Sequence, residues 1–261
     1  MGDFCLSIFR LSNRRGFFVP KLDLGYAEKD TDIAWHINGG GARVYLARTG
    51  SKLVDDLDEQ SADSHFMMKR IVCSLLLARV GLFQPEACGR FFMRNIEGDL
   101  SWTTELDWPD PVPDTGDPAA IARFHDWFTA LTMHTALRRA AEDTHLALTH
   151  PHEALVYVYR GFEWLVVGLG IGWDDLSTMI DVPPAELRNL KKQANVDTGV
   201  RHANRDGMKV RADIYVSGTW VCCLIDAING VRGNLEQGFT KMNSKEVAEA
   251  VGRSVTSTPY E

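Results

Sequence analysis

The stretch WPDPVPDTGDP, residues 108–118, divides the sequence into two parts of different character. It contains four prolines, three aspartates and a glycine, a composition that continues neither a helix nor a strand. Short apolar runs separated by turn signals precede it, and longer helical patterns follow it. We therefore predict an α+β fold, with a mixed, β-rich region (1–107), a linker (108–117), an all-α antiparallel helical bundle (118–235) and a C-terminal tail (236–261).

Strand signals dominate the first part, in runs bounded by turn residues. The triplet Gly39–Gly41 predicts a hairpin turn, and because it opens onto a second strand it does not predict a phosphate-binding loop. We also expect one helix over 64–81, with Gly81 as its stop. The expected strands are 4–11, 32–37, 42–47 and 89–96.

Helix-start signals mark the second part. Asp117 before Pro118 is typical of a cap residue followed by a first-turn proline, and Pro151 with Glu153 suits another first turn. Long helices joined by short connections predict an antiparallel bundle. The expected helices run from 118 to about 145, from 151 onward, over 173–180, from 183 to about 203, and from 210 to about 231.

Charge and cysteine usage narrow the class of protein. The formal net charge of −7 argues against broad attraction to nucleic acid or anionic lipid, so any anion site must be local. The five cysteines are scattered and lack C-x-x-C spacing, which argues against a zinc site or a disulfide framework. This pattern favours a reducing compartment, the cytoplasm. Residues 154–173 have the length of a membrane span, but Arg160 and Glu163 near the middle predict a buried helix.

The segment GVRHANRDGMKVRA, residues 199–212, is the strongest candidate for a site. It places four cations and a histidine within an acidic protein. On a helix, His202 shares a face with Arg205 and with Asn195, while Arg201 lies about 100° around the axis. In one interpretation His202 and Arg205, aided by Arg201 and Lys209, bind a phosphate or carboxylate. In the other, these cations gather at a helix C-terminus because the helix dipole favours them there.

Two charged residues interrupt the helix expected over 152–171, which is apolar almost all round and is expected at the centre of the bundle. Arg160 and Glu163 are three residues apart, and our preferred interpretation is that they pair with each other. Alternatively, Glu163 reaches the 185–203 helix and orients His202 or an arginine, which would add Arg160 and Glu163 to the ligand-binding site.

The histidines do not predict a metal site, because no H-x-x-x-H or E-x-x-H spacing would stack ligands on one helical face. The sequence contains no Walker loop, dinucleotide fingerprint or G-x-S-x-G motif. We therefore expect neither a metal nor a cofactor.

The helical part, with HPHEALVYVYRGFEWL followed by NVDTGVRHAN, resembles the HEPN class of helical bundles over about half of the chain. In that class an arginine, four to six intervening residues and a histidine form a metal-free ribonuclease site across a dimer. His202 matches the histidine. Asn195 stands six intervening residues before it, and no basic residue lies between 193 and 200, so the motif arginine is missing.

Nearly the whole chain resembles an uncharacterised bacterial family, the J-type methylamine-utilisation accessory proteins. The similarity lies in YRGFEWL (159–165), GVRHANRDGMKVRA and WVCCLIDAINGVR (220–232). This resemblance implies a bacterial, cytosolic accessory protein and supplies no catalytic residues.

Three functions follow as expectations. The first is an accessory or binding protein whose local anion site takes RNA or a phosphorylated small molecule. The second is a metal-independent ribonuclease, in which His202 transfers a proton and Arg201 or Arg205 stabilises the phosphate. The third is a structural module that forms a homodimer through the apolar run WVCCLIDAI (220–228).

Overall fold

The computed structural model describes residues 2–12, 19–28, 31–50, 57–96, 118–196 and 209–236. The chain forms two compact units, residues 1–128 and 129–261. The first contains a sheet with helices and the second consists of helices in its described part, so the predicted α+β class is confirmed.

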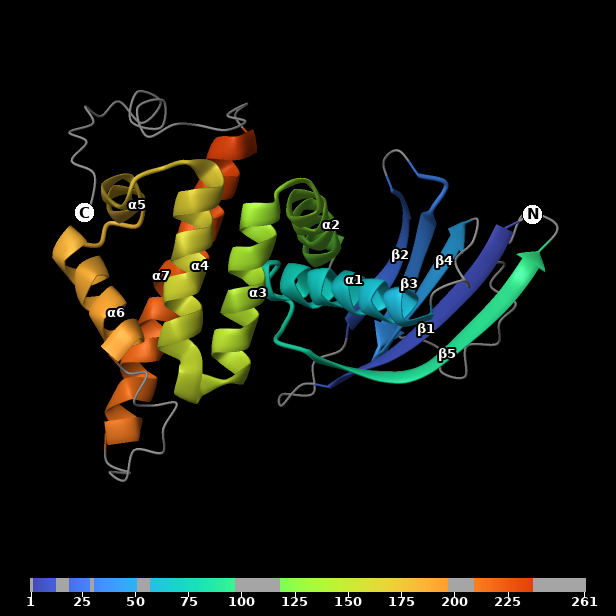
Figure 1. Ribbon diagram of the computed structural model, residues 1–261, viewed down its shortest axis with the longest axis horizontal. Helices are drawn as coiled ribbons and strands as arrows, with labels where there is room; N and C mark the ends of the chain where they lie inside the picture. Colours follow the sequence, from blue (N-terminus) through green and yellow to red (C-terminus); the bar gives the residue numbers. More distant parts are fainter. Residues whose placement is uncertain are drawn as a thin grey trace. The chain divides into compact units, whose positions relative to one another are not determined.

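The first unit contains a five-stranded antiparallel sheet in the order β2-β3-β4-β1-β5 (Figure 1). Central β1 pairs with β4 on one side and β5 on the other, and both pairings are antiparallel. The strands are β1 (Gly2–Ser12), β2 (Val19–Ala27), β3 (Ala34–Gly41), β4 (Arg43–Gly50) and β5 (Gln84–Ile96).

The predicted hairpin joins β3 to β4. Gly40 pairs with Arg43, which leaves Gly41 and Ala42 as the turn. Gly41 has a φ of +61°, a left-handed conformation that glycine adopts without strain. The sequence did not predict β2, although its buried Leu22 alternates with exposed Lys21 and Asp23 as expected of a strand with one covered face.

Helix α1 (Leu57–Leu77) covers one face of this sheet. Ser64 of α1 accepts a buried hydrogen bond from the Ser7 hydroxyl of β1, at 2.9 Å, and the ring of His65 packs edge-on against Phe9. The helix ends before the predicted stop at Gly81. Arg79 takes the left-handed conformation instead, with a φ of 60°.

Helix α2 (Pro118–Met133) begins in the first unit, and the division between the units falls within it. Arg123 Nε donates a hydrogen bond to the carbonyl oxygen of Ala78, at 3.2 Å, and Phe128 packs edge-on against Tyr26 of β2. These contacts explain why its first residues belong with the sheet. The predicted linker 108–117 lies outside the described residues.

Helices make up the described part of the second unit. They are the end of α2, α3 (Thr135–Thr149), a single 3-10 turn η1 (Pro151–Glu153), α4 (Ala154–Leu169), α5 (Trp173–Met179), α6 (Pro184–Val196) and α7 (Lys209–Glu236). The single helix expected from 118 to about 145 is in fact two, because His134 adopts an extended conformation between α2 and α3. No glycine or proline marks this break in the sequence.

Helix α4 contacts α3, α6 and α7, so its central position is confirmed. It is not buried all round, however. Val158, Phe162 and Leu165 are buried, whereas Arg160 and Trp164 lie on an exposed stripe.

Among the helices in the described part of the chain, none alone is both long and apolar enough to cross a membrane. The segment 151–169, which contains η1 and α4, meets that requirement only together with α5, and the two are bent by 113° relative to each other.

Helix α7 buries its apolar side chains within the chain. Val221, Leu224, Ala227 and Ile228 are buried, and α7 contacts both α3 and α4. The apolar face of WVCCLIDAI, proposed above for dimerisation, therefore already packs against helices of the same chain.

Candidate functional site

The basic segment lies at the junction of α6 and α7. Arg201, His202 and Arg205 are outside the described residues. Asn195 and Lys209 lie in α6 and α7 respectively, and their side chains are also outside the described part. The structure therefore places the helices on either side of the segment and not the side chains that the sequence predicts to bind a ligand.

Packing within the helical unit holds the helices on either side of the segment. Helix α6 packs against α4. One side of α6 is buried, and its buried residues are Leu187, Leu190 and Ala194. In Figure 1 the C-terminal end of α6 and the N-terminal end of α7 lie at the same end of the helical unit as the connection between α3 and α4. Helix α7 also contacts η1, which belongs to that connection.

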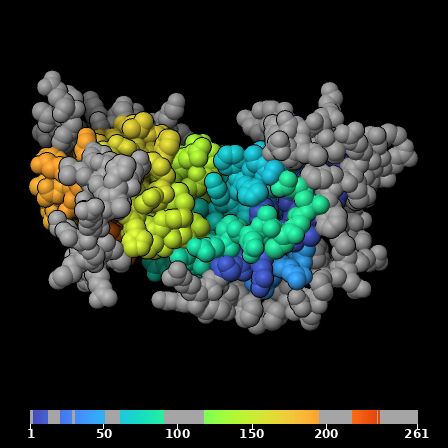
Figure 2. All heavy atoms as spheres, turned by 60° about the horizontal axis from the view of Figure 1, so that its bottom comes forward, coloured from blue at the N-terminus to red at the C-terminus, as the bar shows by residue number. Residues whose placement is uncertain are grey.

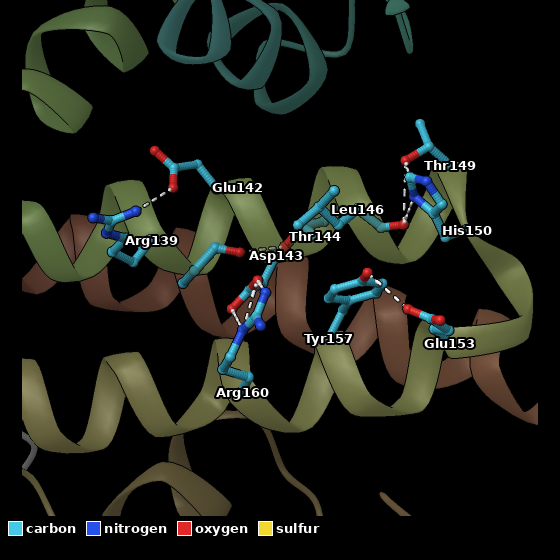
Figure 3. Close-up of polar contacts among 11 residues, drawn as sticks. Arg139, Glu142, Asp143, Thr144, Leu146, Thr149, His150, Glu153, Tyr157 and Arg160 are labelled. Carbon is cyan, nitrogen blue, oxygen red and sulfur yellow. Dashed lines mark hydrogen bonds and ion pairs between the residues drawn. The ribbon is translucent and has the colours of Figure 1, made fainter. Parts of the chain in front are cut away.

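Arg160 forms an ion pair with Asp143 of α3, and the predicted pairing with Glu163 is wrong (Figure 3). Arg160 Nε lies 3.0 Å from Oδ1 and 2.9 Å from Oδ2 of Asp143, and Nη2 also donates to Oδ1. Two nitrogens of the guanidinium thus bind one carboxylate, a geometry that lysine cannot reproduce.

Burial explains this pairing. The Asp143 side chain is 3% exposed and the Arg160 side chain 46% exposed. A carboxylate taken out of water needs a cation or several hydrogen bonds, so the pair lets α3 carry an acidic residue on its buried face. The hydrogen bond to Asp143 is also the main reason that the pKa of Arg160 is raised, and the guanidinium stays charged.

Tyr157 continues the polar contacts toward η1. Its hydroxyl donates to Glu153 Oε2 at 2.8 Å, and this hydrogen bond is the largest cause of the raised pKa of Tyr157. The guanidinium of Arg160 lies 5.1 Å from the centre of the Tyr157 ring, and the His150 ring lies 6.1 Å from it. Figure 3 shows these side chains between the ribbons of α3 and α4, and Figure 2 shows atoms of these two helices in yellow-green and yellow.

Glu163 belongs to a different set of contacts. Its carboxylate is one cause of the raised pKa of Tyr159, and burial is the largest cause. The Tyr159 ring stacks on Trp173 of α5, with 5.6 Å between the ring centres and 4° between the ring planes. Arg160 therefore contacts α3, while Glu163 acts on a residue stacked on α5. The alternative contact between Glu163 and His202 falls on a residue outside the described part.

Sequence reasoning missed Asp143. The signal was present, because Asp143 lies among Leu137, Ala140, Thr144 and Ala147, which form the buried stripe of α3. An acidic residue inside an apolar helical stripe predicts a buried carboxylate that needs a cation from a neighbouring helix.

Within the described ranges, no group of three or more histidine, cysteine, aspartate or glutamate residues is arranged to hold a metal ion.

Comparison with known proteins found no matching family model, no matching curated protein and no matching solved structure.

Proposed function

We propose that this chain is a cytosolic bacterial accessory protein whose HEPN-like helical unit binds an anion, the phosphate of RNA or of a phosphorylated small molecule. Arg201, His202, Arg205 and Lys209 supply the positive charge. The resemblance to the J-type methylamine-utilisation family supports the accessory role, and the five free thiols are consistent with a reducing compartment.

The observation that carries this proposal is the concentration of positive charge between α6 and α7. Four of the 28 lysines and arginines, with one histidine, lie within residues 199–212 of a chain whose net charge is −7. A local cluster of this kind attracts an anion that the rest of the surface repels. Arginine also presents a planar donor fork that matches phosphate oxygens.

The position of the flanking helices adds support. The segment joins the C-terminal end of α6 to the N-terminal end of α7, a helix of 28 residues. The unpaired amides and the dipole at such an N-terminus favour a bound anion. His150 and His152 lie at the connection between α3 and α4, which is found at this same end of the unit (Figure 1).

Arg160 and Glu163 have structural tasks in this proposal. Arg160 neutralises Asp143, and the Glu163 carboxylate raises the pKa of neighbouring Tyr159. Neither side chain is assigned to the anion.

The test compares two double variants in binding to a single-stranded RNA oligonucleotide and to pyrophosphate. Replacing Arg201 and Arg205 by alanine should weaken binding at least about tenfold, because a charge-assisted hydrogen bond contributes about 1.5–3 kcal/mol. The melting temperature should stay within about 2 °C of wild type, because the proposal gives these two arginines no role in stability. The matched control replaces Lys191 and Lys192, two exposed cations of α6, and should bind as wild type does.

Two results would contradict the proposal. Equal binding by both double variants would remove the segment from any site. A large fall in melting temperature without a change in binding would assign the arginines to the end of α6 alone. Metal-independent cleavage of the RNA that is lost in His202→Ala would instead identify a ribonuclease, although Asn195 stands where that class has its arginine.

A further inference from the structure

Helix α4 exposes a stripe of large side chains, which we call the α4 stripe. It consists of Tyr157, Arg160, Trp164 and Val167, which are three, four and three residues apart and so lie on one side of the helix. Tyr157 is partly buried, whereas Trp164 is 38% exposed and Val167 76% exposed. Two large apolar side chains thus lie next to each other in water, which is typical of surfaces that bind another protein.

The surroundings of the stripe have the composition of a protein interface. Among the described residues, the other exposed large apolar side chains are Met133 and Leu148 in the helical unit and Phe66 in the sheet unit. Residues 118–184 contain four arginines and no lysine. Interfaces between proteins favour tryptophan, tyrosine, methionine and arginine over lysine, so this composition favours a protein as the partner.

Two arginines at the stripe are already held in place (Figure 3). Arg160 binds the Asp143 carboxylate through two nitrogens. Arg139 lies 3.0 Å from Glu142, and its guanidinium lies 5.9 Å from the centre of the Trp164 ring. Side chains that are ordered before association lose less conformational entropy when a partner binds. Because both guanidinium groups have a carboxylate partner, this surface does not favour a polyanion.

The α4 stripe is complementary to itself. Two copies of α4 can pack antiparallel about a twofold axis that passes midway between Arg160 and Trp164. Each Arg160 then faces Trp164 of the second copy, and each Tyr157 faces Val167 of the second copy. A guanidinium over an indole ring is a favourable cation–π contact, and a tyrosine ring against valine buries apolar area. A twofold interface requires such facing pairs, because every contact in it occurs twice.

We propose that the α4 stripe is the contact surface of a homodimer in which α4 packs against α4 of a second copy in antiparallel orientation. It takes the place of WVCCLIDAI (220–228), whose apolar face packs within the chain. Each copy contributes one helix face, and small interfaces are typical of weak complexes, so we expect a Kd on the order of 10 µM. The dimer does not depend on the anion site between α6 and α7.

The first experiment is sedimentation equilibrium of the full chain over a dilution series. Trp164→Ala should raise the Kd at least about tenfold, because truncating a central interface tryptophan removes most of its contact area. Val167→Glu should do the same, because it places a charge against the Tyr157 ring, and it should leave the melting temperature of the dilute monomer unchanged, since Val167 is exposed. The matched control is Phe66→Ala, which removes an exposed aromatic ring from the sheet unit and should dimerise as wild type does.

The second experiment tests the orientation by cross-linking, in a background where the exposed Cys88 and Cys222 are replaced by serine. A short bifunctional thiol reagent should join the two copies in the double variant Tyr157→Cys, Val167→Cys, because these positions face each other in the antiparallel dimer. Each single variant should remain uncross-linked. Its two cysteines lie ten residues apart along the helix pair, a separation of about 15 Å at a rise of about 1.5 Å per residue.

Three results would overturn the proposal. The first is a wild-type chain that stays monomeric at about ten times the expected Kd. The second is dimerisation of Trp164→Ala and Val167→Glu with the same Kd as Phe66→Ala, which would place the interface elsewhere. The third is cross-linking of the single variants as readily as of the double variant, which would exclude the antiparallel pairing.

Discussion

Replacing Arg160 by methionine should destabilise the helical unit, because it leaves the Asp143 carboxylate buried without its cation. Breaking a fully buried ion pair in this way costs about 3–5 kcal/mol. Asp143 is 3% exposed, but Arg160 is 46% exposed, so water already screens part of the interaction. We therefore expect the free energy of unfolding to fall by about 2–3 kcal/mol.

The assay is urea denaturation followed by far-ultraviolet circular dichroism at neutral pH. The control is Arg139→Met, which removes a half-exposed cation 3.0 Å from Glu142. Arg138 also lies 4.0 Å from Glu142, so this carboxylate keeps a cation and the loss should be about 0.5 kcal/mol or less. The double variant Asp143→Leu, Arg160→Met should recover most of the stability, because it removes the buried charge together with its partner. An Arg160→Met variant no less stable than Arg139→Met would refute the assignment of Arg160 as the partner of a buried carboxylate.

Three further predictions concern packing, thiols and alkaline pH. Gly161→Ala should lower the free energy of unfolding by about 1–3 kcal/mol, because the new methyl group would lie 2.5 Å from the buried Leu224 side chain of α7. Gly218→Ala should raise it by about 0.5–1 kcal/mol, because the new methyl group meets no atom within 4 Å and alanine favours a helix. Chemical denaturation of both variants checks these opposite signs. Exposed Cys88 should react with a thiol reagent in the native protein, whereas buried Cys5 should react only on unfolding. Burial raises the pKa of the Cys5 thiol and keeps the reagent away from it. Equal rates of modification of the two cysteines in the native protein would contradict this. The pKa of Tyr159 in the folded protein is raised above its ordinary 10.0, so the stability that this residue contributes is present below pH 10 and is lost as the pH rises above 10. Tyr159→Phe should therefore reduce the fall in unfolding free energy above pH 10. An unchanged slope would show that another group is responsible.

Local signals predicted the parts of the fold that depend on neighbours in sequence. The glycine triplet predicted the hairpin at Gly41, since a two-residue turn requires a left-handed conformation. The proline signals predicted the start of α2 and that of the η1 turn, which leads into α4, for the same local reason. β2 was missed because Asp23 and Gly25 dilute its apolar alternation, and its pairing with β3 decides its structure.

Tertiary contacts decided what sequence spacing could not. Arg160 and Glu163 are three residues apart and can pair on a helix. Arg160 instead pairs with Asp143, because a buried carboxylate is more costly to leave without a cation. Spacing along one helix does not contain this information, because the partner is 17 residues away on another helix.

The central claim, an anion site between α6 and α7, is tested most directly by one binding measurement. The affinities of wild type and of the Arg201→Ala, Arg205→Ala variant for single-stranded RNA and pyrophosphate are compared at matched salt. The proposal predicts that wild type binds at least one of these ligands and that the variant binds it at least about tenfold more weakly. Equal affinities, or no binding by wild type, would contradict it.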